Sequence, residues 1–227
     1  MVQAQHIRSS GKIYDELRTR LVTADFSPTD KMKSETLGKE YNCAASTMRE
    51  ILFRLSFDGF LEFEEQKGFR VPELKLEAMK ELMQMRILLE REGVRLSVEN
   101  GGLEWESGVI AAHHKLAHIE KTFMNIDNLK PYLIIWNDAE RHFHESLISA
   151  CGSALLIAMY RNIYDRFRQH LTARQRQYDY RRKNISEHQA IVDAVVKRDV
   201  DLCGQQIEQH ILLALNSSTN ENIARSA

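Results

Sequence analysis

Glu140 and His144 stand four positions apart in the stretch WNDAERHFHESLISACG, and their side chains could bind a divalent metal ion together. Read as a helix, this stretch (136–152) places both residues on the side of Leu147 and Cys151, where side chains should be buried. A buried carboxylate or imidazole without a partner is costly, and a metal ion is one such partner. His188 and His210 lie on two further predicted helices and could supply the remaining ligands.

Spacing alone leaves the ligand pair open, because Asp138 and His142 have the same separation on another face of the helix. We favour Glu140 and His144, since they share the apolar side. A single histidine on a partly apolar helix face is more often an ordinary core or surface residue than a ligand. Three imidazoles and one carboxylate suit Zn, Ni, Mn or Fe(II), and can leave coordination positions open for an exogenous ligand.

The composition is that of an ordinary soluble globular protein, with 227 residues, 43% hydrophobic and 28% charged. The net charge of −1 neither indicates nor excludes a nucleic-acid partner. Three well-separated cysteines without a CxxC motif fit a reducing compartment. There is no signal-peptide pattern and no run that approaches a membrane span. We therefore expect a cytoplasmic protein without a membrane partner.

The first domain is expected to span residues 1–72. Apolar spacing predicts short helices over Lys12–Thr23, Ser34–Tyr41 and Ala44–Phe57. Two apolar runs, Phe60–Phe63 and Phe69–Val71, are separated by EEQKG and predict a small β-hairpin. Three short helices followed by a hairpin are typical of a winged helix-turn-helix.

A winged helix-turn-helix binds double-stranded DNA by placing its recognition helix in the major groove. Arg49 could reach a base edge or a phosphate, and the hydroxyl side chains could bond phosphates. The alternative is a small helical subdomain without a DNA partner, and the pattern alone does not decide between the two. The candidate DNA-binding residues are Lys33, Ser34, Ala45, Ser46, Thr47, Arg49, Lys67 and Gly68.

The second domain is expected to span residues 77–227 and to be entirely helical, so that the whole protein is mainly α. The periodicity predicts six helices that form an antiparallel bundle, a fold that can hold metal ligands in its core. A loop is expected at Asn125–Lys130, with Pro131 opening the next helix, and the tail Ser217–Ala227 is expected to be frayed. The predicted helices are Glu77–Glu99, Trp105–Met124, Pro131–Gly152, Ser153 to about Tyr178, Ser186–Lys197 and Val200 to about Asn216.

The N-terminal motifs resemble the DNA-binding domain of the GntR family of transcriptional regulators. The resemblance is carried by YDEL (14–17), by STMREIL (46–52) with Leu55 and Gly59, and by GFRV (68–71). Ala44 and Ala45 stand where the family usually has Ser or Thr followed by Arg, and Thr47 replaces its usual Pro. Because an arginine that commonly reads a base is missing, we expect an operator sequence that differs from the family norm.

The C-terminal motifs are similar to the FCD effector domain of the FadR-like branch of that family. The matching segments are RILLE (86–90), FHESL (143–147), ACG (150–152) and EH (187–188), followed by His210. The resemblance implies a homodimer and a metal bound by Glu140, His144, His188 and His210. Glu140 replaces the family's Asp, and Ser153 stands where the family often has Asn in the effector pocket.

Arg86 is the candidate for pairing with an effector carboxylate, because a guanidinium binds a carboxylate in a bidentate fork. An ion pair with Glu90, one helical turn along, is an equal alternative. Together these features predict a DNA-binding regulator, with repression as the expected sign, that binds a small organic acid and is not an enzyme. The alternatives are a direct metal sensor, a purely structural metal, and a metal-dependent enzyme with Glu140 as a base. Against the enzyme, no second acid or base group stands at a suitable spacing.

Overall fold

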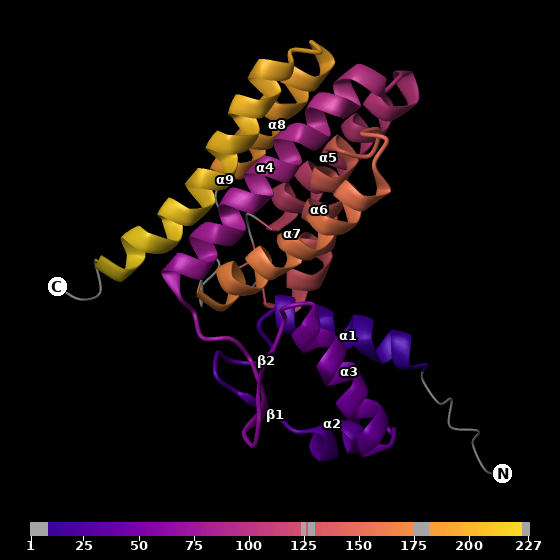
Figure 1. Cartoon of the computed structure of the whole chain (residues 1–227). Coiled ribbons are helices and arrows are strands. Elements are labelled where there is room, and N and C mark those ends of the chain that lie inside the picture. Colours follow the sequence, from indigo (N-terminus) through magenta and orange to yellow (C-terminus); the bar gives the residue numbers. More distant parts are fainter. Residues whose placement is uncertain (1–8, 124–125, 127–129, 175–181, 224–227) are drawn as a thin grey trace. The chain divides into compact units, whose positions relative to one another are not determined.

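The computed structural model describes residues 9–123, 126, 130–174 and 182–223 (Figure 1). The chain separates into two compact units. The first comprises the residues up to Lys75 together with Arg168–Ala173, and the second comprises Leu76–Phe167 and the residues from Arg174 onward. Within the described residues, every helix is too short or too polar to cross a membrane.

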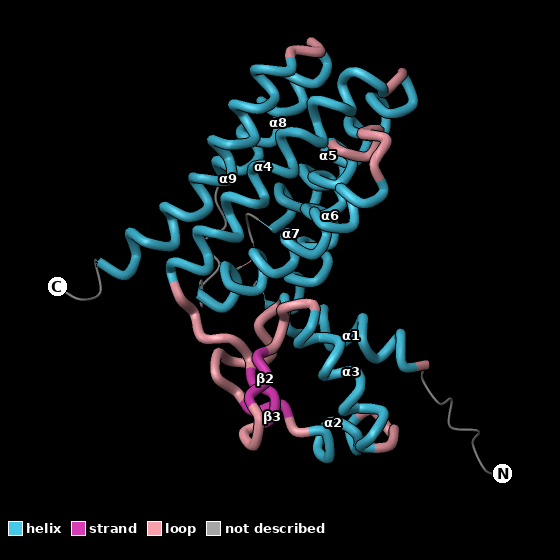
Figure 2. Tube along the Cα trace, in the orientation of Figure 1, coloured by secondary structure: helices cyan, strands magenta, loops and turns pink. Residues whose placement is uncertain are grey.

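The first unit is a winged helix-turn-helix, as predicted. Its helices are α1 (Ser10–Val22), α2 (Ser34–Glu40) and α3 (Ala45–Phe57). The wing strands β2 (Glu62–Glu64) and β3 (Gly68–Arg70) form the expected hairpin. A further strand, β1 (Lys31–Met32), pairs antiparallel with β3 and gives the strand order β1-β3-β2. Figure 2 shows the strands of this small sheet in magenta. The sequence did not predict β1, because two residues are too few to show an alternating pattern.

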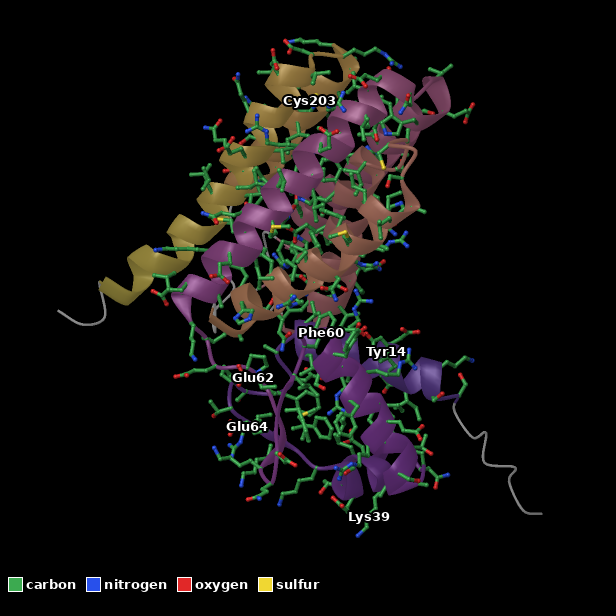
Figure 3. All side chains as sticks on the ribbon, in the orientation of Figure 1. Tyr14, Lys39, Phe60, Glu62, Glu64 and Cys203 are labelled. Carbon is green, nitrogen blue, oxygen red and sulfur yellow. The ribbon has the colours of Figure 1, made fainter. Side chains whose placement is uncertain are left out.

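The core of the first unit is built from the apolar stripes of α1 and α3. Leu17, Leu52 and Leu55 are fully buried, and the wing's Phe69 joins the same cluster. The Tyr14 hydroxyl donates a hydrogen bond to the carboxylate of Asp58, the residue that caps the C-terminus of α3 (Figure 3). This bond joins the first helix to the end of the third and so fixes the recognition helix on the scaffold.

The turn between α2 and α3 depends on a close backbone approach. A Cβ on Gly38 would lie 3.0 Å from the Cys43 carbonyl oxygen, and the Cys43 amide donates to the Gly38 carbonyl at 2.9 Å. Asn42 completes the turn with φ 53°, a left-handed conformation that asparagine tolerates. The small residue at position 38 therefore allows the two helices to pack closely.

The second unit is a helical bundle, and the six predicted helices are present among its described residues (Figure 1). The closest helix pairs are α4 with α9, α5 with α6, and α8 with α9. A 3-10 turn at Lys130–Tyr132 precedes α6. The helices are α4 (Leu76–Asn100), α5 (Leu103–Phe123), α6 (Leu133–Leu147), α7 (Ala154–Arg174), α8 (Arg182–Val196) and α9 (Val200–Ile223).

Several predicted helix ends were wrong. The helix that carries Glu140 ends at Leu147 and not at Gly152, because the following amides bond three residues back and Gly152 reverses the chain at φ 74°. Pro131 lies in the 3-10 turn rather than in the first turn of α6. Helix α8 begins four residues earlier than expected, at Arg182.

Helix α9 continues to Ile223, so the backbone of the first part of the expected frayed tail is helical. No glycine or proline stands between Asn216 and Ile223 to end the helix earlier. The predicted ends at Met124 and Tyr178 lie outside the described residues.

Candidate metal centre

Four potential ligands converge in the interior of the helical unit. Glu140 and His144 come from α6, His188 from α8 and His210 from α9. Each offers one ligand atom, and these four atoms all lie within 4.8 Å of one another. All four side chains are buried, with His144 and His188 fully inaccessible to solvent. The structure therefore brings together the set that the sequence predicted.

Local geometry explains the convergence. Glu140 and His144 are one helical turn apart on the buried side of α6. Helices α8 and α9 are joined by a tight turn in which Arg198 adopts φ 55°, and they pack against each other. This hairpin brings His188 and His210, which are 22 positions apart, so close that their Nε2 atoms are 3.2 Å apart.

The geometry fits a divalent ion. Two ligands about 2.0–2.1 Å from one tetrahedral ion should be roughly 3.3 Å apart, and the Nε2–Nε2 distance is 3.2 Å. Imidazole nitrogens together with one carboxylate suit first-row transition metals of the Zn, Ni, Mn and Fe(II) class.

The alternative pair on α6 lies on the outer surface. The Asp138 side chain is 59% exposed and pairs with Arg141, and His142 is exposed as well. Neither residue belongs to the buried cluster. Burial therefore separates two pairs that spacing could not.

A glutamate lies beside the Nδ1 atom of each histidine in the cluster. Glu90 Oε1 of α4 is 2.5 Å from His144 Nδ1, and Glu187 Oε2 of α8 is 2.9 Å from His210 Nδ1. Glu120 Oε1 of α5 is 3.6 Å from His188 Nδ1. These contacts were not predicted from the sequence. The glutamates come from helices whose packing against one another cannot be inferred from residue spacing.

The buried cluster alters the protonation of its members. Burial raises the pKa of Glu90 above its ordinary value, although the guanidinium of Arg86 opposes this. Burial lowers the pKa of His210 well below its ordinary value, and His188 adds to the effect. A neutral imidazole is the form that binds a metal, so the lowered pKa of His210 favours coordination.

Arg86 lies beside the candidate metal centre on α4, with its side chain 2% exposed. Its Nε atom donates to Glu90 Oε2 at 3.2 Å, so the alternative ion pair is present. Its guanidinium carbon lies 4.6 Å from the centre of the Tyr164 ring. The buried Nη2 atom has no hydrogen-bond partner among the described residues. The ion pair thus leaves the Nη2 edge of the guanidinium without a hydrogen bond to a described residue.

Ser153, the other predicted effector contact, caps a helix. Its hydroxyl accepts a hydrogen bond from the Leu156 amide at 3.1 Å, at the start of α7. Its predicted role in effector binding remains a prediction.

The predicted DNA-binding residues lie at helix starts and in the wing. Lys33 and Ser34 begin α2, the run Ala45–Thr47 begins α3, and Arg49 is exposed one turn further along. Lys67 is exposed in the turn between β2 and β3, where its ammonium lies 2.5 Å from Glu64 Oε2. Gly68 follows with φ 79°, which only glycine adopts without strain. This placement agrees with the DNA-binding surface of a winged helix-turn-helix, and the contacts of these residues with DNA remain predictions.

Comparisons with known proteins agree with both halves of the sequence reading. Residues 9–71 match the family of bacterial regulatory proteins called the gntR family, and residues 81–213 match the FCD domain. The HTH-type transcriptional regulator BphR of Paraburkholderia xenovorans LB400 is 32% identical over 204 residues, which cover 87% of this chain and 80% of that protein.

Two proteins of Escherichia coli extend the comparison. The HTH-type transcriptional repressor GlaR of strain K12 is 27% identical over 88% of this chain and 90% of its own. The solved structure of McbR/YncC has a TM-score of 0.79 at 17% identity, covering 94% of this chain and 98% of that one, and it shows the same fold. The chain therefore belongs to the GntR family of DNA-binding transcriptional regulators, carries an FCD domain, and is not an enzyme.

Proposed function

We propose that this regulator is a repressor whose helical unit binds a divalent metal and a small organic acid, and that the acid weakens operator binding. The observation that carries the proposal is the convergence of four buried ligand atoms within 4.8 Å, from three helices. A buried cluster of this type needs a cation to offset the cost of desolvating its polar atoms. A bound metal would supply open coordination positions for a carboxylate oxygen of the acid.

The organic acid is proposed because the buried guanidinium of Arg86 lies next to the four candidate metal ligands. Arg86 is charged, enclosed and only partly paired, with its Nη2 atom left over from the Glu90 ion pair. A carboxylate that reaches this nitrogen would gain a charge-assisted hydrogen bond in a site from which water is excluded. The metal and Arg86 would then hold the two ends of one small anion.

The DNA-binding half is proposed to be residues 1–72 and the effector-binding half residues 77–227. Exposed Ser46 and Arg49 at the start of α3 would enter the major groove. Family members usually act as dimers, so we propose a homodimer on a palindromic operator in the cytoplasm. The repressor sign is supported by GlaR, a relative whose name describes a transcriptional repressor.

A second candidate is a direct metal sensor, in which the ion is itself the signal. The same cluster supports it, because a metal that joins α6, α8 and α9 could change their packing without any organic ligand. A third candidate, a purely structural metal, would stabilise the fold without altering the response to a ligand.

The test uses the full chain and a duplex operator that the protein itself selects from random DNA. Metal-loaded and chelator-stripped protein are each titrated with a panel of small organic acids. Thermal melting reports ligand binding, and fluorescence anisotropy of the duplex reports operator release. We expect at least one acid to raise the melting temperature and release the operator only when metal is present.

The variant His188→Ala should abolish metal binding and the acid response, and His118→Ala is the matched control because His118 is exposed on α5. Operator release by metal alone would favour the sensor. A response to acid that survives in the stripped protein, or in His188→Ala, would show that the metal has no part in effector binding.

A further inference from the structure

The second layer around the candidate metal centre consists of three glutamates from three different helices. Glu90 belongs to α4, Glu120 to α5 and Glu187 to α8. Glu90 and Glu187 lie within hydrogen-bond distance of Nδ1 of His144 and His210, and Glu120 is the carboxylate beside Nδ1 of His188, at 3.6 Å. None of the three belongs to the convergent ligand set. The arrangement gives every imidazole one carboxylate on its outer side.

A carboxylate at Nδ1 determines which nitrogen of a neutral imidazole carries the hydrogen. Neutral imidazole has one N–H donor and one lone pair, and an ionised carboxylate, the form that the Arg86 ion pair favours at Glu90, is only an acceptor. The hydrogen therefore belongs on Nδ1, and the lone pair is left on Nε2. At His188 and His210, the Nε2 atoms lie 3.2 Å apart on the inner side.

Two lone pairs at this distance repel each other unless a cation lies beside them. The outer carboxylates therefore favour a ligand set in which the Nε2 atoms face one ion. In metal sites generally, such outer contacts fix the ring orientation and raise the basicity of the ligand.

We propose that Glu90, Glu120 and Glu187 are positioning residues that hold the three imidazoles with hydrogen on Nδ1 and with Nε2 directed at the metal. This inference rests on the proposed metal binding, and it assigns to these three glutamates a role in setting the affinity for the metal.

The three contacts are not equal. Glu90 and His144 are both fully buried and 2.5 Å apart. Glu187 is 18% exposed, so water can partly replace it. Glu120 is buried, but its 3.6 Å separation from His188 exceeds a normal hydrogen bond. The Oε1 atom of Glu120 also accepts a hydrogen bond from Trp136 Nε1 at 3.4 Å. We therefore expect Glu90 to have the largest effect on metal affinity.

The first experiment measures the zinc affinity of the full chain by competition with a chromophoric chelator. Glu90→Gln should weaken zinc binding by about 10- to 100-fold, and Glu120→Gln and Glu187→Gln by up to about 10-fold. Glu90→Ala should lose more zinc affinity than Glu90→Gln, because the amide oxygen of the glutamine can still accept a hydrogen bond from His144 Nδ1.

Glu145→Gln is the matched control. It stands next to His144 on α6, but its carboxylate pairs with Arg161 and lies on the outer side of the helix. Its zinc affinity should stay within about twofold of that of the unaltered protein, since no outer contact of an imidazole is lost.

The second experiment needs no variant, so it remains valid if the substitutions prevent folding. Nitrogen-15 chemical shifts of the histidine rings in the zinc-loaded protein should show hydrogen on Nδ1 and metal on Nε2 for the three histidines. A purely structural role of the glutamates would not determine the tautomer.

Metal on Nδ1 of any of the three rings, or equal zinc affinity for Glu90→Gln and Glu145→Gln, would overturn the inference while leaving metal binding intact. Failure of the unaltered protein to bind zinc, nickel, manganese or iron(II) would instead overturn the proposed function and this inference with it.

Discussion

The two units of this protein bury different kinds of side chain. Among described residues 9–75, the buried set is apolar or tyrosine, with Thr23 as the one other polar member. The helical unit buries two ionic partners, Arg86 and Glu90, together with a set of carboxylates and imidazoles beside them. Residues 9–75 therefore carry their charged side chains at the surface, whereas the helical unit buries part of its own.

The difference shows how each unit obtains its stability. Apolar burial stabilises the winged helix without any further partner. Buried charged groups are weak evidence for stability, because their desolvation offsets much of their attraction. The helical unit should therefore depend on what it binds, and the winged helix should not.

Removal of the proposed metal should give the largest loss of stability, and the loss should be confined to the helical unit. For a metal present at 1,000 times its dissociation constant, binding adds about 4 kcal/mol to the free energy of unfolding of the helical unit. Hydrogen exchange measured by mass spectrometry should show faster exchange in α6, α8 and α9 after chelation. Exchange in α1 and α3 should not change, and an equal response in both units would contradict the contrast.

Leu52→Ala should destabilise the first unit by about 2–5 kcal/mol, because it leaves a cavity in a close-packed apolar core. Leu52 is fully buried in α3. The control is Phe57→Ala in the same helix, whose side chain is 93% exposed and whose loss should change stability by less than about 0.5 kcal/mol. Denaturant unfolding measures both variants. Zinc affinity should be unaltered in each, and a weakened affinity in Leu52→Ala would show that the units are not independent.

Gly93→Ala should destabilise the helical unit by about 1–3 kcal/mol, through overpacking. A Cβ at this position would lie 2.6 Å from Ile148 Cγ2, in the turn that follows α6. Gly108→Ala on α5 is the control, because no atom of the described residues outside its chain neighbours and its own helical backbone lies within 4 Å of the added carbon. It should instead stabilise the helix by up to about 1 kcal/mol. Thermal melts that move in the same direction for both variants would contradict the packing argument.

The sequence predicted the parts of the fold that depend on local pattern. The apolar stripes that contain Leu17 and Leu52 predicted the helices of the first unit. The i, i+4 spacing left two ligand pairs open in the candidate metal centre, and the apolar side of the helix favoured Glu140 and His144. The early end of α6 was not predicted, because the buried residues Ile148 and Cys151 continue the apolar pattern after the helix has ended.

The outer glutamates were missed for a different reason. Glu120 lies on α5 and reaches a histidine on α8, so its role depends on how two helices pack and not on any spacing within one. Glu187 is adjacent to His188 in the sequence but contacts His210. Pairings across helices of this kind are set by tertiary structure.

Glu90 divides its two carboxylate oxygens between Arg86 and His144, and under the proposed function this division would couple the binding of the acid to that of the metal. An acid that draws Arg86 away from Glu90 changes how firmly that carboxylate holds His144. Reciprocity then requires that metal occupancy change the affinity for the acid by the same factor. If the proposed acid and metal favour each other's binding, a protein short of the metal would need more of the acid to give the same transcriptional response, and one promoter would report the supply of both.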